Sequence, residues 1–206
     1  FYYNRGKQKH SFTYNFIKNN VKSLLNIGTI ENSNSQNQLQ YAHLVKQYWL
    51  INGTFYMGSA TSKSDTYSSK NFELKNYSIE PKLTYLLDTN CSFSVFYEYK
   101  NKENQINTLD KLQQQKAGLT FNYLSEKSFT INAGYSFYSN NFTGNAQSPV
   151  GFAMLEGLLP GKNSTWNILL QKKLTQYLDL NINYLGRKSE SIKVIHTGSV
   201  QLRAYF

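Results

Sequence analysis

Cysteine, proline and long apolar runs are scarce in this sequence. It has one cysteine, Cys91, and three prolines among 206 residues. One cysteine excludes an internal disulfide framework and a metal site made of several cysteines, and few prolines leave strands largely uninterrupted. No segment approaches the roughly 20 consecutive apolar residues of a membrane-spanning helix. Because only helices and closed barrels satisfy every backbone polar group in lipid, a membrane span in this chain has to be made of strands.

Sequence signatures of catalysis are also missing. His10, His43 and His196 are far apart, at spacings unlike a metal-ligand set. The sequence has no Gly-x-Ser-x-Gly elbow and no phosphate-binding glycine loop. We therefore predict that the chain is not an enzyme and holds no metal or cofactor. One alternative stays open, because small membrane barrels can hydrolyse lipids or peptides with residues at the rim, where we expect His196 and Ser199.

The first residues lack the features of a precursor. The chain opens on Phe1-Tyr2-Tyr3, with no initiator Met, no charged n-region and no apolar h-region. We interpret residues 1–206 as one domain, the C-terminal part of a longer chain. If Phe1-Tyr2-Tyr3 is the end of a preceding strand, the closed structure contains more strands than this chain supplies.

Aromatic residues, in contrast, are abundant, at 16% of the sequence, and they recur with a period of two. Between Cys91 and Lys100, apolar residues alternate with polar ones, with one exception at Phe96, which is the pattern of a strand with two different faces. Similar alternation surrounds Phe121, Tyr135, Trp166, Ile182 and Leu202, and weaker alternation occurs at Phe12–Phe16, Val21–Ile30 and Trp49–Met57. Between Phe72 and Tyr85 the phase slips, which predicts a β-bulge near Asn76. About ten strands result, each close to or longer than the roughly 9 to 11 residues of a tilted membrane strand.

The predicted connections alternate in length. Short links are expected at Ser33–Asn37, Asp88–Asn90, Ser125–Lys127 and Thr175–Tyr177, and long ones at Thr61–Lys70, Lys102–Lys111 and Asn140–Asn163. In bacterial outer-membrane barrels the periplasmic turns are short and the outer loops are long, so the short links are placed on the periplasmic side. A tight turn at Asn19-Asn20 breaks the pattern.

The formal net charge is +10, which in a soluble domain would suggest nucleic-acid binding. The lysines are instead scattered over strand ends and loops, where a barrel near anionic headgroups tolerates them, so we predict no nucleic-acid partner. Arg187, Lys188, Lys193 and Arg203 are expected at or near the last hairpin. Arg203 is expected in the lumen, either in an ion pair with Glu98 or Asp179 or as part of a basic lumen that favours anions.

One long link has an unusual composition for an outer loop. The segment Pro149–Pro160 gathers five apolar residues, Phe152, Met154, Leu155, Leu158 and Leu159. Exposed together they would form an apolar patch. Three interpretations stay open: the segment folds into the barrel mouth as a lid or plug, it docks a partner protein, or it packs on neighbouring loops.

The last predicted strand alternates up to the final residue, with Val200, Leu202, Ala204 and Phe206 on one face. Barrel-assembly machinery recognises a terminal strand by edge pairing, in which alternate side chains supply specificity. We interpret these four residues as an insertion signal, the alternative being a plain amphipathic strand.

Two segments of the last sixty positions carry a family resemblance. They are Phe152–Asn163, followed by Trp166, and the tail Gly186–Ser189 with His196–Phe206. They resemble the C-terminal barrel of large outer-membrane proteins of the Bacteroidota type, most of which are uncharacterised. The resemblance implies fold and location, and it implies no activity.

Taken together, the sequence predicts an all-β, antiparallel up-and-down transmembrane barrel in the bacterial outer membrane, acting as the anchor, pore or scaffold of a larger envelope transport or assembly complex. Its expected partners are outer-membrane lipid, the barrel-assembly machinery and other envelope proteins. A soluble β-sandwich that binds glycans or proteins is the remaining alternative; it would show turns about every 8 to 12 residues and bury its rings between two sheets.

Overall fold

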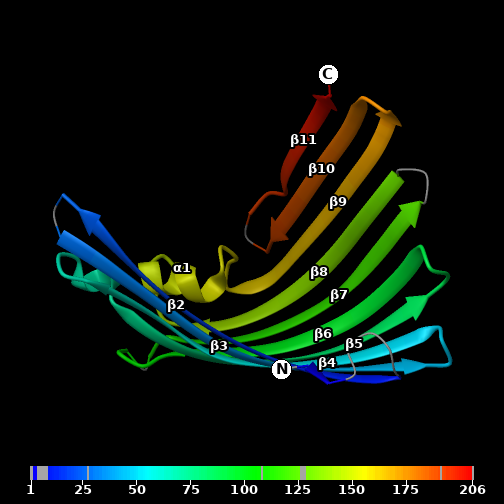
Figure 1. The fold of residues 1–206 in the computed structure, drawn as a ribbon. Coiled ribbons are helices and arrows are strands. Elements are labelled where there is room, and N and C mark those ends of the chain that lie inside the picture. Colours follow the sequence, from blue (N-terminus) through cyan, green and yellow to red (C-terminus); the bar gives the residue numbers. More distant parts are fainter. Residues whose placement is uncertain are drawn as a thin grey trace.

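In the computed structural model, which describes residues 2–3, 9–26, 28–107, 109–125, 129–190 and 192–205, the chain forms one curved antiparallel sheet. Eleven strands are hydrogen-bonded in chain order, and together they make the trough seen in Figure 1. The strands are β1 (Tyr2–Tyr3), β2 (His10–Leu25), β3 (Gly28–Val45), β4 (Trp49–Ser64), β5 (Phe72–Leu86), β6 (Cys91–Asn104), β7 (Lys111–Ser125), β8 (Phe129–Thr143), β9 (Gly161–Thr175), β10 (Leu178–Ser189) and β11 (Ile195–Ala204). The predicted all-β up-and-down topology is confirmed.

The alternation in sequence separates an outer, convex face from an inner, concave one. On β6, Phe93 and Val95 are 45% and 38% exposed, whereas Ser94 and Glu98 are 2% and 8% exposed. The exception at Phe96 has a local cause. Its ring lies over Gly118 on the inner face of β7, where a Cβ would come within 2.4 Å of the Phe96 ring, so the glycine leaves room for an inward aromatic side chain.

The predicted β-bulge near Asn76 is wrong. The pairing of β4 with β5 runs without a shift through Ala60↔Leu74, Gly58↔Asn76 and Met57↔Tyr77. The phase of the hydrophobic pattern changes because Phe72 and Leu74 are apolar residues on the inner face. They pack there against a helix, described below.

Connections at one end of the sheet are short and most of those at the other end are longer, as predicted; the exception at the second end is the two-residue link between Leu25 and Gly28. The strands leave residues 46–48, 87–90 and 176–177 as links at the first end, and 65–71, 105–110, 144–160 and 190–194 at the second. The predicted turn at Ser125–Lys127 falls largely on residues 126–128, which lie outside the described residues. The longer link 65–71 contains the 3-10 turn η1 (Ser68–Lys70).

Two predicted turns near the N-terminus are wrong. Asn19-Asn20 lies inside β2 and Ser33–Asn37 lies inside β3, where the ladder continues through Asn19↔Asn34 and Asn20↔Ser33. The tight hairpin falls instead between Leu25 and Gly28, so the predicted strand Val21–Ile30 is two strands and their turn. Asn and Ser are typical turn residues, but here they form the hydrophilic ends of two long strands.

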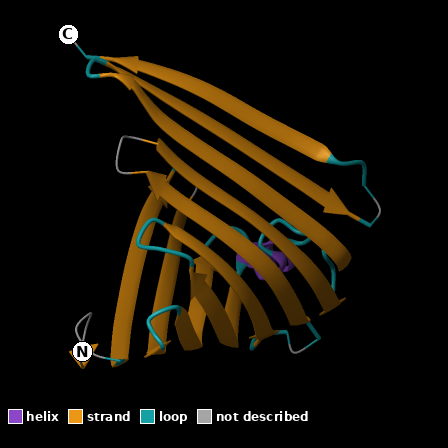
Figure 2. Cartoon of the chain, turned by 90° about the vertical axis from the view of Figure 1, so that its right-hand side faces the viewer, coloured by secondary structure: helices purple, strands orange, loops and turns teal. Residues whose placement is uncertain are grey.

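Within the described residues the sheet is open. β1 pairs with β2, β11 pairs with β10, and no ladder joins β1 to β11. Figure 2 shows the N- and C-terminal ends of the chain far apart at the two edges of the curved sheet. Closure into a barrel, and the strands that would complete it, stay predictions.

The link 144–160 contains the helix α1 (Pro149–Leu155), which lies against the concave side of the sheet (Figure 1). Ser148 begins the helix, its Oγ accepting a hydrogen bond from the backbone N–H of Gly151 at 3.0 Å, as N-cap residues do. Its buried side chains pack on the wall in an apolar cluster made of Leu74, Leu112, Val150, Met154 and Leu155. No helix in the described part of the chain has the length and apolar character needed to cross a membrane.

Candidate functional site: the polar inner face and helix α1

Polar side chains fill most of the inner face. The buried polar and charged residues are Ser62, Ser64, Ser78, Thr84, Ser94, Glu98, Lys102, Asn104, Asp110, Gln114, Asn140 and Asn163, whereas only five hydrophobic residues are buried in the described chain. A sandwich core would show the opposite composition, with its rings inside. The soluble β-sandwich alternative therefore does not fit this structure.

The outer face carries an apolar band, with a pair of aromatic rings near each end. Near the short links, Trp49 and Tyr85 lie 4.7 Å apart between ring centroids, and Tyr77 and Tyr99 form a pair near the other end at 6.3 Å. Between them Ile79 and Leu83 are exposed. Tyr77 and Tyr85 are separated by roughly 26 Å along the strand at 3.3 Å per residue, before tilt. This agrees with the roughly 25 Å apolar band, flanked by aromatic residues, of outer-membrane barrels.

Three inward-facing charges hold the end of α1 against the wall. The Lys102 ammonium donates to the carbonyl oxygen of Met154 at 2.9 Å and to Glu156 Oε1 at 2.6 Å. Lys100 Nζ lies 3.6 Å from the same Glu156 oxygen and 3.3 Å from Glu98 Oε1. We call Lys100, Lys102 and Glu156 the helix anchor.

The anchor perturbs the acid that follows the helix. Burial against the wall favours the neutral form of Glu156, but the ammonium groups of Lys102 and Lys100 outweigh this effect and hold the pKa of Glu156 below its usual value. Glu156 has a positive φ of 55°, so this residue ends the helix in the left-handed region. The carboxylate is therefore charged, and bound to the wall, over the whole neutral range.

Two buried asparagines hold the segment between α1 and β9. Asn163 Nδ2 donates to the carbonyl oxygen of Leu159 at 2.8 Å, and Asn140 Nδ2 donates to the same oxygen at 3.0 Å. Asn163 Oδ1 in turn accepts from the Leu159 N–H at 3.3 Å. Asn140 is itself bound by Gln114. The segment 156–160 is thus hydrogen-bonded to β8 and β9 instead of projecting from the sheet.

The predicted lid or docking segment therefore folds onto the inner face. Met154 and Leu155 are 0% and 1% exposed, and Leu158 and Leu159 are partly buried. Phe152 is 68% exposed and takes no part in the apolar cluster. Sequence reasoning missed the helix anchor and the two asparagines. Lys100 and Lys102 share the even-numbered phase of Glu98, which was a usable signal for the inner face, but nothing in the sequence paired them with Glu156.

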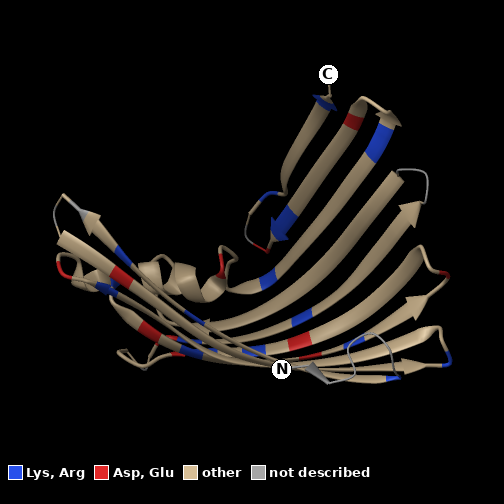
Figure 3. Cartoon of the chain, in the orientation of Figure 1, with Lys and Arg blue, Asp and Glu red and all other residues tan. Residues whose placement is uncertain are grey.

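The predicted basic cluster does not assemble. Arg187 pairs with Ile195 and Arg203 pairs with Asp179, at opposite ends of the last hairpin, and Lys188 alternates onto the outer face. Figure 3 shows the charged residues of β9, β10 and β11 near both ends of these strands. The expected ion pair of Arg203 is absent from the described residues: Glu98 binds Lys100 and Lys116, and Asp179 accepts a hydrogen bond from the Tyr205 hydroxyl at 3.0 Å.

The terminal strand presents its apolar residues outward at an open edge. Val200 and Leu202 are 71% and 60% exposed, and they pair with Ile182 and Leu180, while Ala204 pairs with Leu178. Phe206 lies outside the described residues. The use of this strand as an insertion signal stays a prediction.

The two residues of the enzyme alternative lie on opposite faces of β11. His196 pairs with Gly186 and Ser199 pairs with Asn183, an even and an odd position of the same strand. On the outer face the His196 ring stacks on Tyr184, and its Nδ1 is 2.8 Å from the Tyr184 hydroxyl oxygen. A nucleophile–base pair needs hydrogen-bond contact, so these two residues cannot form one. In the described ranges no group of three or more His, Cys, Asp or Glu residues could hold a metal ion.

Comparisons with known proteins bear on the fold. No protein-family model and no curated protein matches the chain. Among solved structures, the outer-membrane expressed OmpT of Vibrio cholerae aligns with a TM-score of 0.52 at 8% identity, over 87% of this chain and 54% of that one. The NanC porin aligns at 0.48 with 13% identity, over 96% of this chain and 94% of that one. The translocator domain of the autotransporter NalP from Neisseria meningitidis aligns at 0.47 with 9% identity, over 96% and 75%. With the banded outer face and polar inner face described above, the likeness to OmpT gives this chain the fold of bacterial outer-membrane β-barrel proteins.

Proposed function

We propose that this chain forms the wall of an outer-membrane pore whose lumen is narrowed by α1, within a larger envelope transport or assembly complex. The observation that carries the proposal is the seating of α1 on the polar inner face. A lumen that served only as a packed anchor would be filled by side chains of the wall. Here an apolar helix is held at the wall by an ion pair and by hydrogen bonds that can be broken without breaking a strand ladder.

The outer face supports the membrane part of the proposal. The apolar side chains of the band contact lipid tails, and the ring pairs near its two ends lie at the headgroup level. The open edges at β1–β2 and at β11 offer backbone groups to further strands or to the assembly machinery. Membership among the Bacteroidota-type proteins, and contact with other envelope proteins, are parts of the proposal that rest on the sequence resemblance.

Ion conductance tests the pore. The full chain, inserted in planar bilayers, is compared with a variant in which Pro149–Pro160 is replaced by a short Gly/Ser linker. We expect a larger conductance from the variant, because the segment no longer occupies the lumen. A matched control exchanges the turn Lys46–Tyr48, at the other end of the sheet, for a linker, and should leave conductance unchanged. Equal conductance of the first variant and the unaltered chain would remove the plug, and no conductance from either would leave the anchor or scaffold role.

A further inference from the structure

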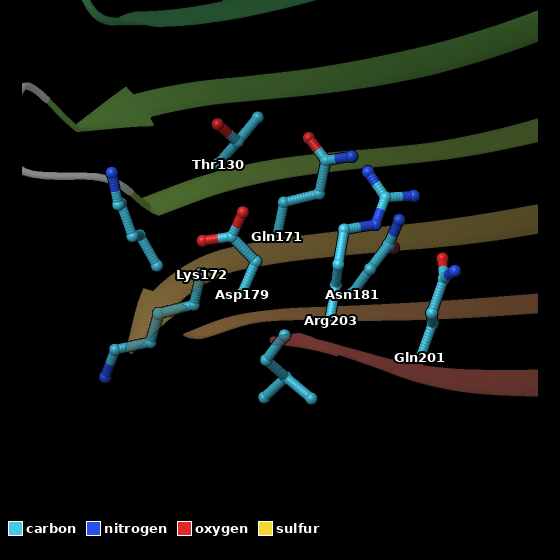
Figure 4. A pocket seen from close by; sticks show the side chains of 9 residues that line it. Thr130, Gln171, Lys172, Asp179, Asn181, Gln201 and Arg203 are labelled. Atoms are coloured by element: carbon cyan, nitrogen blue, oxygen red, sulfur yellow. The ribbon is translucent and has the colours of Figure 1, made fainter. Parts of the chain in front are cut away.

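Six inward-facing polar side chains form a two-row cluster on the last three strands, away from α1. In the first row Asp179 lies between Lys173 and Arg203, and in the second row Asn181 lies between Gln171 and Gln201, each as a direct cross-strand partner. Directly opposed residues have Cβ atoms roughly 4.5–5.5 Å apart, so the six side chains share one surface. Figure 4 shows those of Gln171, Asp179, Asn181, Gln201 and Arg203 gathered over β9, β10 and β11. We call this set the β9–β11 cluster.

Several groups of the cluster have unused hydrogen-bonding capacity. Among the residues that the structure describes, the Arg203 guanidinium makes no ion pair. Asp179 Oδ1 and Asn181 Oδ1 are buried, yet neither atom has a hydrogen-bond partner in the described chain. Buried polar atoms are almost always bonded to protein or water. The Arg203 guanidinium and the side-chain amides of Gln171 and Gln201 line one pocket, where a ligand can reach them.

The pocket at this cluster has the size and chemistry of a site for a small hydrophilic molecule. Its volume is about 440 Å³ and its lining is polar, with Leu180 the one apolar residue among the described residues that line it. Pockets for small ligands span roughly 300–1,000 Å³. An apolar ligand would find little to pack against here. A solute that carries hydroxyl groups would find both donors and acceptors in the amides and in Asp179.

We propose that the β9–β11 cluster binds a small hydroxylated anion, of the sugar-acid class, from the lumen. Arg203 holds the carboxylate through its two parallel N–H donors, the geometry in which guanidinium recognises planar anions. Gln171, Asn181 and Gln201 bind the hydroxyl groups. Asp179 accepts from a hydroxyl and disfavours a bare anion that has none. The inference rests on the proposed function only in that the concave face must be a lumen open to solutes.

Calorimetry of the full chain in lipid nanodiscs tests the site, with D-glucuronate as the probe. Acetate, which has the carboxylate without the hydroxyl groups, and methyl glucoside, which has the hydroxyl groups without the carboxylate, are the comparison ligands. We expect glucuronate to bind more tightly than either. Arg203→Gln should weaken glucuronate binding roughly tenfold or more, because a charge-assisted bidentate contact is lost. Arg187→Gln is the matched control: it removes the same charge from the inner face at the other end of the same hairpin. It should leave the Kd within about twofold, because Arg187 lies eight residues along β10 from Asp179, roughly 26 Å, and cannot contact the same solute.

Gln201→Ala provides a second variant that alters no charge. It should weaken glucuronate severalfold and leave acetate unchanged. Equal binding of acetate and glucuronate, or an equal loss in Arg203→Gln and Arg187→Gln, would mean a diffuse basic surface and would overturn the proposal, as would an absence of glucuronate binding. Calorimetry does not depend on conduction. A chain that binds glucuronate but keeps its conductance when Pro149–Pro160 is replaced would therefore refute the plug and keep the site.

Discussion

Met154 determines how firmly α1 is held on the wall. It is 0% exposed and lies in the apolar cluster with Leu74 and Leu112. A buried Met→Ala change costs about 2–5 kcal/mol, and the lower half of that range applies here because a short helix can shift to fill part of the gap. Replacing Met154 by Ala should therefore weaken the seating of α1 by about 2–3 kcal/mol, a factor of roughly 30 to 150 in the seated-to-free ratio.

Hydrogen exchange of the α1 amides measures that ratio directly, since amides of a detached helix exchange with solvent. The Phe152 N–H, which donates to the Ser148 carbonyl oxygen at 2.9 Å, is one such amide. Phe152→Ala is the control, because Phe152 is on the same helix but 68% exposed, and we expect exchange within about threefold of the unaltered chain. Similar acceleration in both variants, or none in Met154→Ala, would show that the apolar cluster does not hold the helix.

Three further predictions concern the anchor and the two faces. Lys102→Gln should weaken the seating of α1 by about 1–2 kcal/mol, a value discounted because the partner Glu156 is half-exposed. The open probability of the pore should then rise by roughly five- to thirtyfold. Lys111→Gln breaks only the exposed outer pair with Glu103 and should leave the open probability unchanged. The pKa of Glu156 is depressed in the seated state. The contribution of Glu156 to the seating of α1 is therefore complete above the ordinary carboxyl pKa and is lost as pH falls through the lower, seated value. Conductance should accordingly rise in strong acid, and Glu156→Gln should abolish that rise; an acid response kept in Glu156→Gln would refute the assignment. Ile79→Lys, inside the outer band but two residues from Tyr77, should destabilise the folded chain in lipid by about 1–3 kcal/mol in urea titrations. Tyr48→Lys, at an exposed turn residue, should have little effect, and equal losses would contradict a lipid-facing band.

The parts of the fold that alternation alone determines could be predicted from the sequence. On β6 and β8 every second residue lies on the outer face, so the alternation of apolar and polar residues was enough to place each strand. The bulge near Asn76 and the turns at Asn19-Asn20 and Ser33–Asn37 failed for a different reason. Apolar residues such as Leu74 can lie on the inner face when a distant helix covers them, and asparagine-rich strand ends beyond the membrane have the composition of turns. Both depend on contacts between distant segments, which local patterns do not contain.

The candidate site was predictable in composition but not in geometry. The five apolar residues of Pro149–Pro160 indicated a segment that had to be covered, and the structure covers Met154 and Leu155. Their partners Leu112 and Lys102 are 42 and 52 positions away from Met154 in the chain. Arg203 was expected in the lumen, in an ion pair with Glu98 or Asp179 or as part of a basic lumen. The structure makes Arg203 and Asp179 neighbours on adjacent strands, yet the Tyr205 hydroxyl is the group bonded to Asp179.

All contacts of α1 described above involve one arc of the sheet, from β4 to β9, and none involves β1, β2, β10 or β11. The obstruction and its support are thus independent of the two margins of the sheet. Adding strands at those margins would enlarge the bore without loosening the constriction. The width of the bore could therefore change by duplication of hairpins, and the constriction made by α1 could change separately, by substitutions in the link 144–160.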